Sequence, residues 1–166
     1  GKLRHASVDA LHRLLIGSSS LNLPPDMWVQ TLRELVLPLV SDFSKAVAAS
    51  ARKKSLPEHI KSLQMAIDML TSVLVKYTRT ISDDNDFGAV WELTFVVLRE
   101  STTSLSSTDK ATAENIREGT RTLLSSLEAE GTLCETWQDG AGKDLWVVTR
   151  TGAASMPGLG VDSLFT

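Results

Sequence analysis

The sequence predicts an all-α protein made of antiparallel helix hairpins stacked side by side, in an armadillo- or HEAT-like helical array. Apolar residues recur three or four positions apart in five or six segments, short polar breaks separate these segments, and no segment alternates convincingly like a strand. Helices joined by short connections pack as antiparallel neighbours, and successive pairs stack in helical solenoids. We expect residues 1–166 to form one domain. We also expect a fragment of a longer protein, because the chain starts with Gly1 and lacks an initiator Met.

The first half of the chain predicts three helices, and the middle one contains a proline. Residues 6–16 form the first, with one apolar face made of Val8, Leu11, Leu14 and Leu15. The second opens behind Asp26 as its N-cap, and its stripe consists of Trp28, Leu32, Leu35, Leu39, Phe43 and Val47, widened by Val36 and Leu37. Pro38 lies within this stripe, but the apolar spacing continues in phase beyond it, so we expect a kink and not a break. The third begins with Pro57 at its first position, and its stripe consists of Leu63, Ile67, Leu70, Leu74, Tyr77 and Ile81.

The second half predicts two further helices and one ambiguous segment. From Phe87 a stripe runs through Trp91, Phe95, Leu98 and Thr102, and the polar run at 101–110 breaks it. The next helix, with Gly131 just beyond its end, has a stripe made of Ala113, Ile116, Thr120, Leu123, Leu124 and Leu127. The segment 144–154 is either a short helix or a strand, because its Val-Val-Thr run is β-branched. Residues 156–166 are expected to be irregular.

The spacing Trp-x-x-Thr occurs three times, at Trp28, Trp91 and Trp146. In the first two copies the ring lies within one turn of a predicted helix start, and the threonine three residues on shares its face. A large ring at that position would wedge against the preceding hairpin. We therefore interpret the motif as a repeated packing unit. An exposed tryptophan that anchors a partner or a lipid, and a chance recurrence, remain as alternatives.

Composition and charge exclude several classes of protein. The net charge of −3 does not fit a nucleic-acid binder, which is usually basic. The single cysteine, Cys134, excludes an intramolecular disulfide framework and fits a reducing compartment such as the cytoplasm. No apolar run approaches the roughly 20 residues of a membrane-spanning helix, and the N-terminus lacks the pattern of a signal peptide.

No pattern of residues predicts an enzyme, a metal ion or a cofactor. His5 and His12 are seven residues apart, and neither cysteine nor carboxylate completes a metal set with them. The run from Asp83 resembles the start of a calcium loop, but it lacks the glycine at the sixth position and the glutamate at the twelfth. Cys134 has no neighbours typical of an activated thiol. The Gly-Leu-Gly at 158–160 lacks the strand–turn–helix context of a nucleotide-binding loop.

One basic run, Arg52-Lys53-Lys54, is the candidate contact site for a lipid or a protein partner. The three residues follow the second long helix closely. Cations near a helix C-terminus are stabilised by the helix dipole, which explains them without any ligand. They also carry the charge that attracts anionic lipid headgroups, so contact with a membrane surface remains open.

Three blocks of sequence carry a resemblance to a known family. They are "WVQTLRELVLPLVSDF" at 28–43, where Trp opens a helix that runs into a Pro-Leu pair, "ENIREGTRTLLSSLEAEGTL" at 114–133, and "DLWVVTRTGAASMPGLGVDSLF" at 144–165. Their sequences and order resemble the C-terminal region of the large Golgi-type guanine-nucleotide exchange factors for Arf GTPases, the GBF/Gea/GNOM subfamily. The chain departs from the family at Val147, where Glu is usual, at Arg150, where Trp is usual, and at Arg121-Thr122, where Lys-Asn is usual.

The resemblance implies a helical regulatory domain downstream of the catalytic exchange domain. The parent protein would activate Arf by promoting GDP release on Golgi membranes, in vesicle traffic. No segment of this chain resembles the exchange domain, so no residue is assigned to nucleotide exchange. The implied location is cytoplasmic and peripheral to Golgi membranes. The implied partners are other domains of the parent, small GTPases and Golgi lipids.

Two other functions remain open from the residues alone. A direct lipid-surface binder would present a helix with bulky apolar residues left exposed after packing. An unrelated helical-repeat adaptor would hold a peptide or protein partner in a groove between its helices.

Overall fold

The computed structural model describes residues 2–17 and 23–166, and its regular structure is helical. The helices are α1 (Lys2–Ile16), α2 (Pro25–Thr31), the π-helical turn η1 (Leu32–Val36), α3 (Leu37–Ala49), α4 (Leu56–Ile81), α5 (Phe87–Leu105), α6 (Lys110–Ala129), α7 (Leu145–Ala154) and the 3₁₀ turn η2 (Asp162–Phe165). Among the described residues no strand forms, and one isolated antiparallel bridge joins Gln138 to Asp144. The all-α prediction is confirmed.

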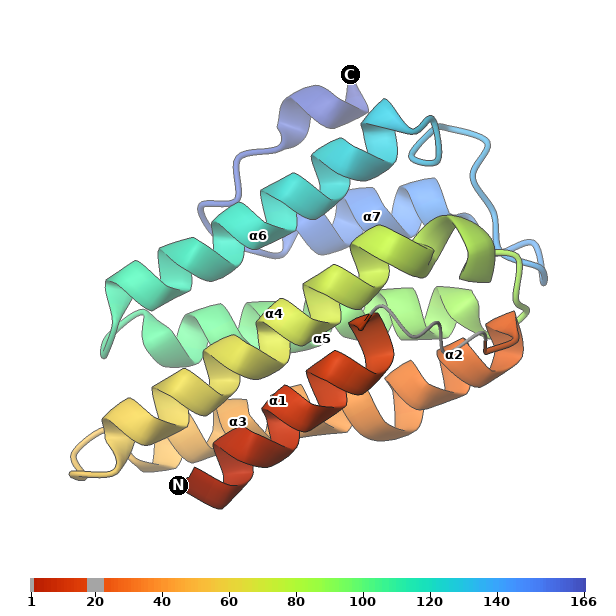
Figure 1. The fold of residues 1–166 in the computed structure, drawn as a ribbon. Coiled ribbons are helices and arrows are strands. Elements are labelled where there is room, and N and C mark those ends of the chain that lie inside the picture. Colours follow the sequence, from red (N-terminus) through yellow and green to blue (C-terminus); the bar gives the residue numbers. More distant parts are fainter. Residues whose placement is uncertain (1, 18–22) are drawn as a thin grey trace.

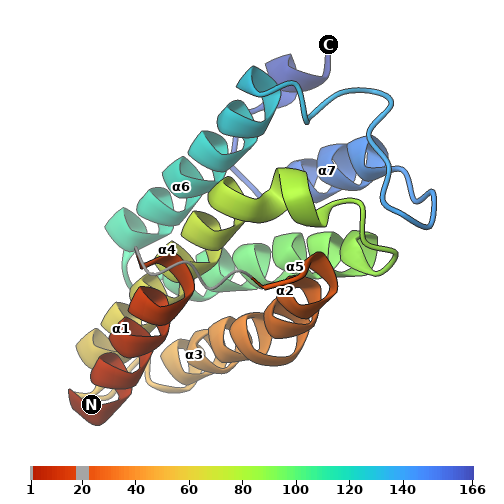
Figure 2. The ribbon, with the colours of Figure 1, turned by 45° about the vertical axis from the view of Figure 1, so that its right-hand side comes forward.

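The helices form two layers, and the chain crosses from one layer to the other at each turn between long helices (Figure 1). α1, α4 and α6 lie side by side in one layer, and α3, α5 and α7 lie side by side in the other (Figure 2). Successive long helices run antiparallel, so the helices within one layer run in the same direction. The C-terminal ends of α3, α5 and α7 therefore share one edge of the array. The predicted stack of antiparallel hairpins is confirmed.

The core lies between the two layers and is filled mostly by the predicted apolar stripes. The buried residues of α6 are those that the spacing predicts, namely Ala113, Ile116, Thr120, Leu123, Leu124 and Leu127. On α4 the predicted stripe is buried except at Tyr77, which is half-buried. A helix turns once in 3.6 residues, so positions three and four apart share the face that meets the other layer.

The interruption expected at Pro38 takes the form of the π turn just before it. The Leu37 N–H donates to the Leu32 carbonyl five residues earlier, so this turn holds one extra residue. The extra residue rotates the helix, and Val36 and Leu37 take the inward positions. Leu35, predicted in the stripe, is instead 45% exposed. The helix continues beyond Pro38 as predicted, because α3 follows η1 directly.

Two predictions at the N-terminal end are wrong. Leu14, placed on the apolar face of the first helix, is 59% exposed, while Leu15 beside it is buried against the core. Asp26 is not the N-cap of α2, because the helix begins at Pro25 and is preceded by Pro24. A proline fits the first helical position because the N–H that it lacks would have no partner there. The predicted loop at 17–26 lies partly outside the described residues.

Polar residues continue α5 beyond its predicted end. The helix runs to Leu105, although the sequence predicted a break across 101–110. Hydroxyls of Thr102, Thr103 and Ser104 donate to carbonyls three or four residues earlier, at 2.9 Å each. Such bonds satisfy the hydroxyls within the helix, so the polar run remains helical. The true break is the short turn before Lys110.

The ambiguous segment 144–154 is a helix, and its start explains why. Asp144 is the N-cap of α7, and its carboxylate accepts a hydrogen bond from the Val147 N–H at 2.9 Å. At the other predicted boundary, Gly131 has a φ of +76° after α6. The Thr132 N–H donates to the Leu127 carbonyl, and the Gly131 N–H donates to the Glu128 carbonyl, each at 2.9 Å. These two bonds form a Schellman motif. The predicted role of Gly131 is confirmed.

The segment after α7 packs on α6. It has no regular structure up to Val161, as the sequence predicted, and it ends in the 3₁₀ turn η2. The Arg117 Nε–H donates to the Pro157 carbonyl at 2.9 Å, and Arg121 donates to the carbonyls of Gly158 and Leu159 at 2.8 and 2.7 Å. The apolar side chains Met156, Leu159 and Val161 are buried. The two glycines of the Gly-Leu-Gly run have φ of +78° and +67°, so they serve this turn.

Asp109 caps the N-terminus of α6 and makes its stability depend on pH. Its carboxylate accepts bonds from the Thr112 N–H at 3.0 Å and the Thr112 hydroxyl at 2.7 Å, which lower the pKa of Asp109. Asp109→Ala should lower the free energy of unfolding by about 1 kcal/mol at neutral pH. A carboxyl whose pKa is lowered by folding stabilises above its unfolded pKa, and this contribution is lost as the pH falls through the folded pKa.

Urea unfolding of the unsubstituted chain and of Asp109→Ala, at neutral pH and at about pH 3, measures this effect. The difference between the two proteins should shrink at the lower pH. A difference that stays constant or grows on acidification would contradict the capping role.

Candidate functional site

The tryptophans of the first two Trp-x-x-Thr copies are buried. Trp28 is 2% exposed and stacks on Tyr77, with ring centroids 4.3 Å apart. Trp91 is fully buried, and its ring contacts those of Phe87, Phe95 and Trp137. Neither ring is available to a partner or a lipid. The burial expected of a packing unit is confirmed for these two copies, and the exposed-anchor alternative is wrong for them. Outside their own helices, the two rings contact the later rings of Tyr77 and Trp137, whereas the sequence predicted contact with the preceding hairpin.

The three copies share one local hydrogen bond, and two of them meet in the core. In each copy the threonine hydroxyl donates to the carbonyl of the residue just before the tryptophan, at 2.8, 2.9 and 2.5 Å. Thr149, of the third copy, also accepts a bond from the Trp91 Nε1–H at 2.7 Å. Trp146 itself is half-buried and packs edge-to-face on Phe165, 5.0 Å between centroids. The motif therefore helps to join α5 to α7.

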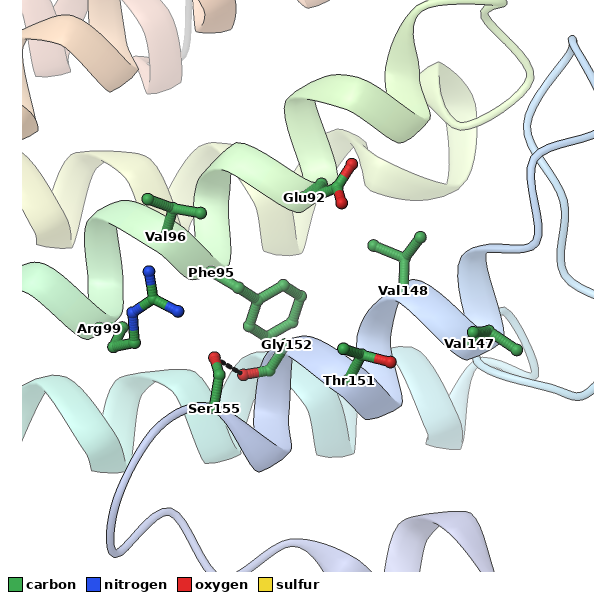
Figure 3. Close-up of a pocket in the computed structure, with 9 residues that line it drawn as sticks. All are labelled: Glu92, Phe95, Val96, Arg99, Val147, Val148, Thr151, Gly152 and Ser155. Carbon is green, nitrogen blue, oxygen red and sulfur yellow. Dashed lines mark hydrogen bonds between the residues drawn. The ribbon is translucent and has the colours of Figure 1, made fainter.

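A shallow groove lies between α5 and α7, on the outer side of their contact (Figure 3). Its volume is about 270 Å³. Its apolar wall and floor are formed by Phe95 and Val96 from α5 and by Val147, Val148 and Gly152 from α7. We call this surface the α5–α7 groove. No catalytic arrangement of side chains lines it, but an apolar hollow of this kind can hold the side chains of a partner.

The two ends of the α5–α7 groove differ in charge. Towards the start of α5, Glu92 accepts a hydrogen bond from Lys143 at 2.6 Å, so a lysine of the preceding loop balances its charge. Towards the end of α5, the Arg99 guanidinium lies beside Ser155 (Figure 3). Arg99 is partly buried and forms no ion pair with a carboxylate among the described residues. Arg99 also lines a second groove, between α3 and α5, together with Lys45.

Gly152 permits the close approach of α7 to α5 beneath the groove. A Cβ at this position would overlap the ring of Phe95. Gly152→Val should therefore lower the free energy of unfolding by about 1–3 kcal/mol, because the packed core has no room for it. Gly119→Ala on α6 is the matched control, since nothing lies within 4 Å of its added Cβ. Alanine there should raise stability by up to about 1 kcal/mol.

Thermal or urea unfolding of the two glycine variants measures these effects. Opposite signs are expected at the two positions. Equal stability of Gly152→Val and the unsubstituted chain would show that α7 does not pack on Phe95 in this way.

The structure places the candidate residues Arg52, Lys53 and Lys54 in the turn between α3 and α4. All three are exposed. α3 ends at Ala49, and its last turn contains no basic residue. The helix-dipole explanation for the three cations is therefore weakened, because the dipole acts mainly within the last turn. The turn lies at the edge that the C-terminal ends of α3, α5 and α7 share, away from the start of α7.

The other candidate residues have local structural surroundings. His5 Nε2 lies 3.1 Å from the Glu58 carbonyl, between α1 and α4. The Asp84 carboxylate accepts a bond from the Asp86 N–H at 2.8 Å within the turn before α5. Cys134 is partly buried. In the described parts of the chain, no three His, Cys, Asp or Glu side chains gather as metal ligands would.

No described helix combines the length and hydrophobicity that crossing a bilayer requires.

Sequence reasoning missed Asp139, which is 7% exposed and organises the loop before α7. Its carboxylate accepts bonds from the N–H groups of Gly88, Ala141 and Lys143 at 3.0, 3.0 and 2.8 Å. One aspartate thus caps the start of α5 and closes its own turn. The Asp-Gly pair in "WQDGAGKD" indicated a turn, but nothing in the sequence linked it to α5. Asp139 also places Lys143 near Glu92, at one end of the groove.

The shifted pKa values lie away from the α5–α7 groove. Hydrogen bonds from Arg121 and then Arg117 lower the pKa of Glu114 on α6. Hydrogen bonds to Glu114 and then to Glu118 raise the pKa of Arg121. Burial raises the pKa of Asp68 on α4. The partners that shift these pKa values lie mostly on the same helix as the group itself, and none of these groups indicates a proton-transfer site.

The two helical layers and the open grooves define a class of protein: an α-helical repeat region, which is not a catalytic fold. A sequence model of the family described as GBF1-like, tetratricopeptide repeat region, matches residues 1–159. The chain belongs to this family. Searches of curated proteins and of solved structures found no match. Tetratricopeptide repeats, like armadillo and HEAT repeats, are stacked helix hairpins. The predicted family is confirmed.

Proposed function

We propose that this chain is a regulatory scaffold domain of a large Arf guanine-nucleotide exchange factor. It would support recruitment of the parent to Golgi membranes and control Arf activation in vesicle traffic. The observation that carries this proposal is the match of residues 1–159 to the GBF1-like repeat region. The two-layered helical array supports it, because stacked hairpins offer extended surfaces for other domains and for partners. The proposed partners are other domains of the parent, small GTPases and Golgi lipids.

Deletion of these residues from the full-length parent tests the proposal. Two readouts are needed: the fraction of the parent on Golgi membranes, and the amount of GTP-bound Arf in the same cells. We expect the deletion to change at least one of them while the parent remains present at its normal level. A parent that is recruited and activates Arf normally without residues 1–166 would refute the regulatory role.

A second proposal concerns the exposed turn of Arg52, Lys53 and Lys54, which would contact anionic lipid. Its support is that three adjacent cations project from one edge of the array with no ion pair to a described carboxylate. Each basic residue near an anionic membrane contributes about 1 kcal/mol. Reversing all three to Glu should abolish flotation with anionic liposomes at low salt. If the unsubstituted 166-residue chain does not float with such liposomes, this proposal is wrong.

A further inference from the structure

The helices that form the α5–α7 groove each leave one large apolar side chain exposed. Among the described residues, two of the large apolar side chains that remain exposed lie on these helices, namely Leu93 at 44% and Val147 at 51%. Val147 lines the α5–α7 groove. Leu93 directly follows the groove residue Glu92 on α5. An exposed apolar side chain such as Val147 beside an apolar hollow is a feature of protein-interaction sites.

The size of the α5–α7 groove favours part of a polypeptide over a small molecule. Its volume of about 270 Å³ is below the usual range for ligand pockets, which enclose most of their ligand. It is open along one side and has room for a few apolar side chains. An amphipathic segment places such side chains on one face and leaves its polar face in water.

The charge of the groove indicates which polar groups such a segment carries. The carboxylate of Glu92 is already paired with Lys143. The Arg99 guanidinium, partly buried at the other end, has no carboxylate partner among the described residues. A partly buried arginine gains more from a carboxylate than a fully exposed one does, because its fork geometry allows two hydrogen bonds and water screens it less. The complementary group is therefore an acidic side chain.

We propose that the α5–α7 groove binds an acidic amphipathic segment of a protein partner. Apolar side chains of that segment pack on Val96, Val147 and Phe95, and one of its carboxylates pairs with Arg99. This inference rests on the scaffold role proposed above and names the chemistry of the partner. A membrane fits the groove less well, because a bilayer surface attracts several exposed cations together and the groove offers one recessed cation. The chain is itself acidic, at −3, so general charge attraction does not favour such a partner.

Fluorescence anisotropy with a defined probe tests the groove. The probe is a fluorescein-labelled amphipathic peptide with Leu at every third or fourth position and Asp or Glu at the flanking positions. The control peptide carries Lys in place of each acidic residue. The protein is the 166-residue chain, compared with Arg99→Glu, Arg99→Gln and Val147→Asp. Arg79→Glu is the matched control, because Arg79 is an exposed arginine on α4 in the other layer.

We expect the acidic peptide to bind and the Lys peptide to bind about tenfold more weakly or not at all. Arg99→Glu and Val147→Asp should each weaken the acidic peptide about tenfold, Arg99→Gln less, and Arg79→Glu less than twofold. Unchanged thermal unfolding of these variants shows that the loss is local. Absence of binding, equal binding of the two peptides, or an equal effect of Arg79→Glu would overturn the proposal.

Anionic phosphatidylserine vesicles form the last arm of the test. If they bind the chain through Arg99 and compete with the peptide, the groove is a lipid site and the proposal is wrong. None of these readouts involves Arf or the Golgi. Absence of peptide binding to the unsubstituted chain therefore contradicts the groove assignment alone, and normal recruitment of the full-length protein that lacks residues 1–166 contradicts the regulatory role alone.

Discussion

Trp91→Ala should lower the free energy of unfolding by about 3–5 kcal/mol, and the melting temperature by on the order of 10 °C. Trp91 is fully buried where α5 meets α7. Its ring packs edge-to-face on Phe95 and Trp137, with centroids 5.3 and 5.6 Å away. Removing it leaves a cavity that the surrounding rings fill incompletely. It also leaves Thr149 without the indole N–H that it accepts at 2.7 Å.

Two milder variants separate packing from hydrogen bonding at this site. Trp91→Phe keeps part of the ring and loses the N–H, so its loss should be smaller than that of Trp91→Ala. Thr149→Val keeps the shape and removes the acceptor, which should cost about 1–3 kcal/mol because a buried N–H is left unpaired. Urea unfolding of the three variants measures the order. If the free energy of unfolding of Trp91→Ala lies within about 1 kcal/mol of that of the unsubstituted chain, roughly the range of a surface substitution, the buried position of Trp91 is wrong.

Trp28→Ala should cost about 3–5 kcal/mol for the same physical reason, at the other end of the array. Trp28 is 2% exposed and stacks on Tyr77 of α4, with an interplanar angle of 26°. The ring joins the start of α2 to α4, so its loss should loosen the N-terminal hairpin. Denaturant unfolding followed by fluorescence of the remaining tryptophans measures the change.

Trp146→Ala is the matched control for both tryptophan predictions. Trp146 is half-buried and contacts Phe165 of the C-terminal turn. Trp146→Ala should lower the free energy of unfolding clearly less than the other two variants do, because part of the Trp146 surface is already in water. A folded Trp28→Ala variant as stable as the unsubstituted chain would restore the interpretation of Trp28 as an exposed anchor.

Helical periodicity predicted the core of this protein well, because burial follows spacing wherever a helix is regular. The stripes of α4 and α6 show this: their predicted positions are buried apart from Tyr77, which is half-buried. The same reasoning failed at Leu35, because a π turn before Pro38 adds a residue and rotates the face. It also failed at Leu14, at the end of α1, the outermost helix of its layer, which has a neighbour on one side only.

The candidate site could not be predicted, because it depends on contacts between distant segments. The α5–α7 groove joins residues about fifty positions apart, and Asp139 holds a loop against the start of α5. Neither arrangement leaves a periodic pattern. The basic turn at Arg52 was visible in the sequence as a charge run, and its three residues are exposed in the structure. Its role in lipid or partner contact stays a prediction.

Nucleotide exchange on Arf, measured as GDP release in the presence of liposomes, tests the central claim most directly. The comparison uses the 166-residue chain alone, the full-length parent, and the parent lacking these residues. A regulatory scaffold predicts no release by the chain alone, and different rates for the two forms of the parent. Acceleration of GDP release by the isolated chain would contradict the account, because a helical scaffold without an exchange domain would then be acting as the catalyst.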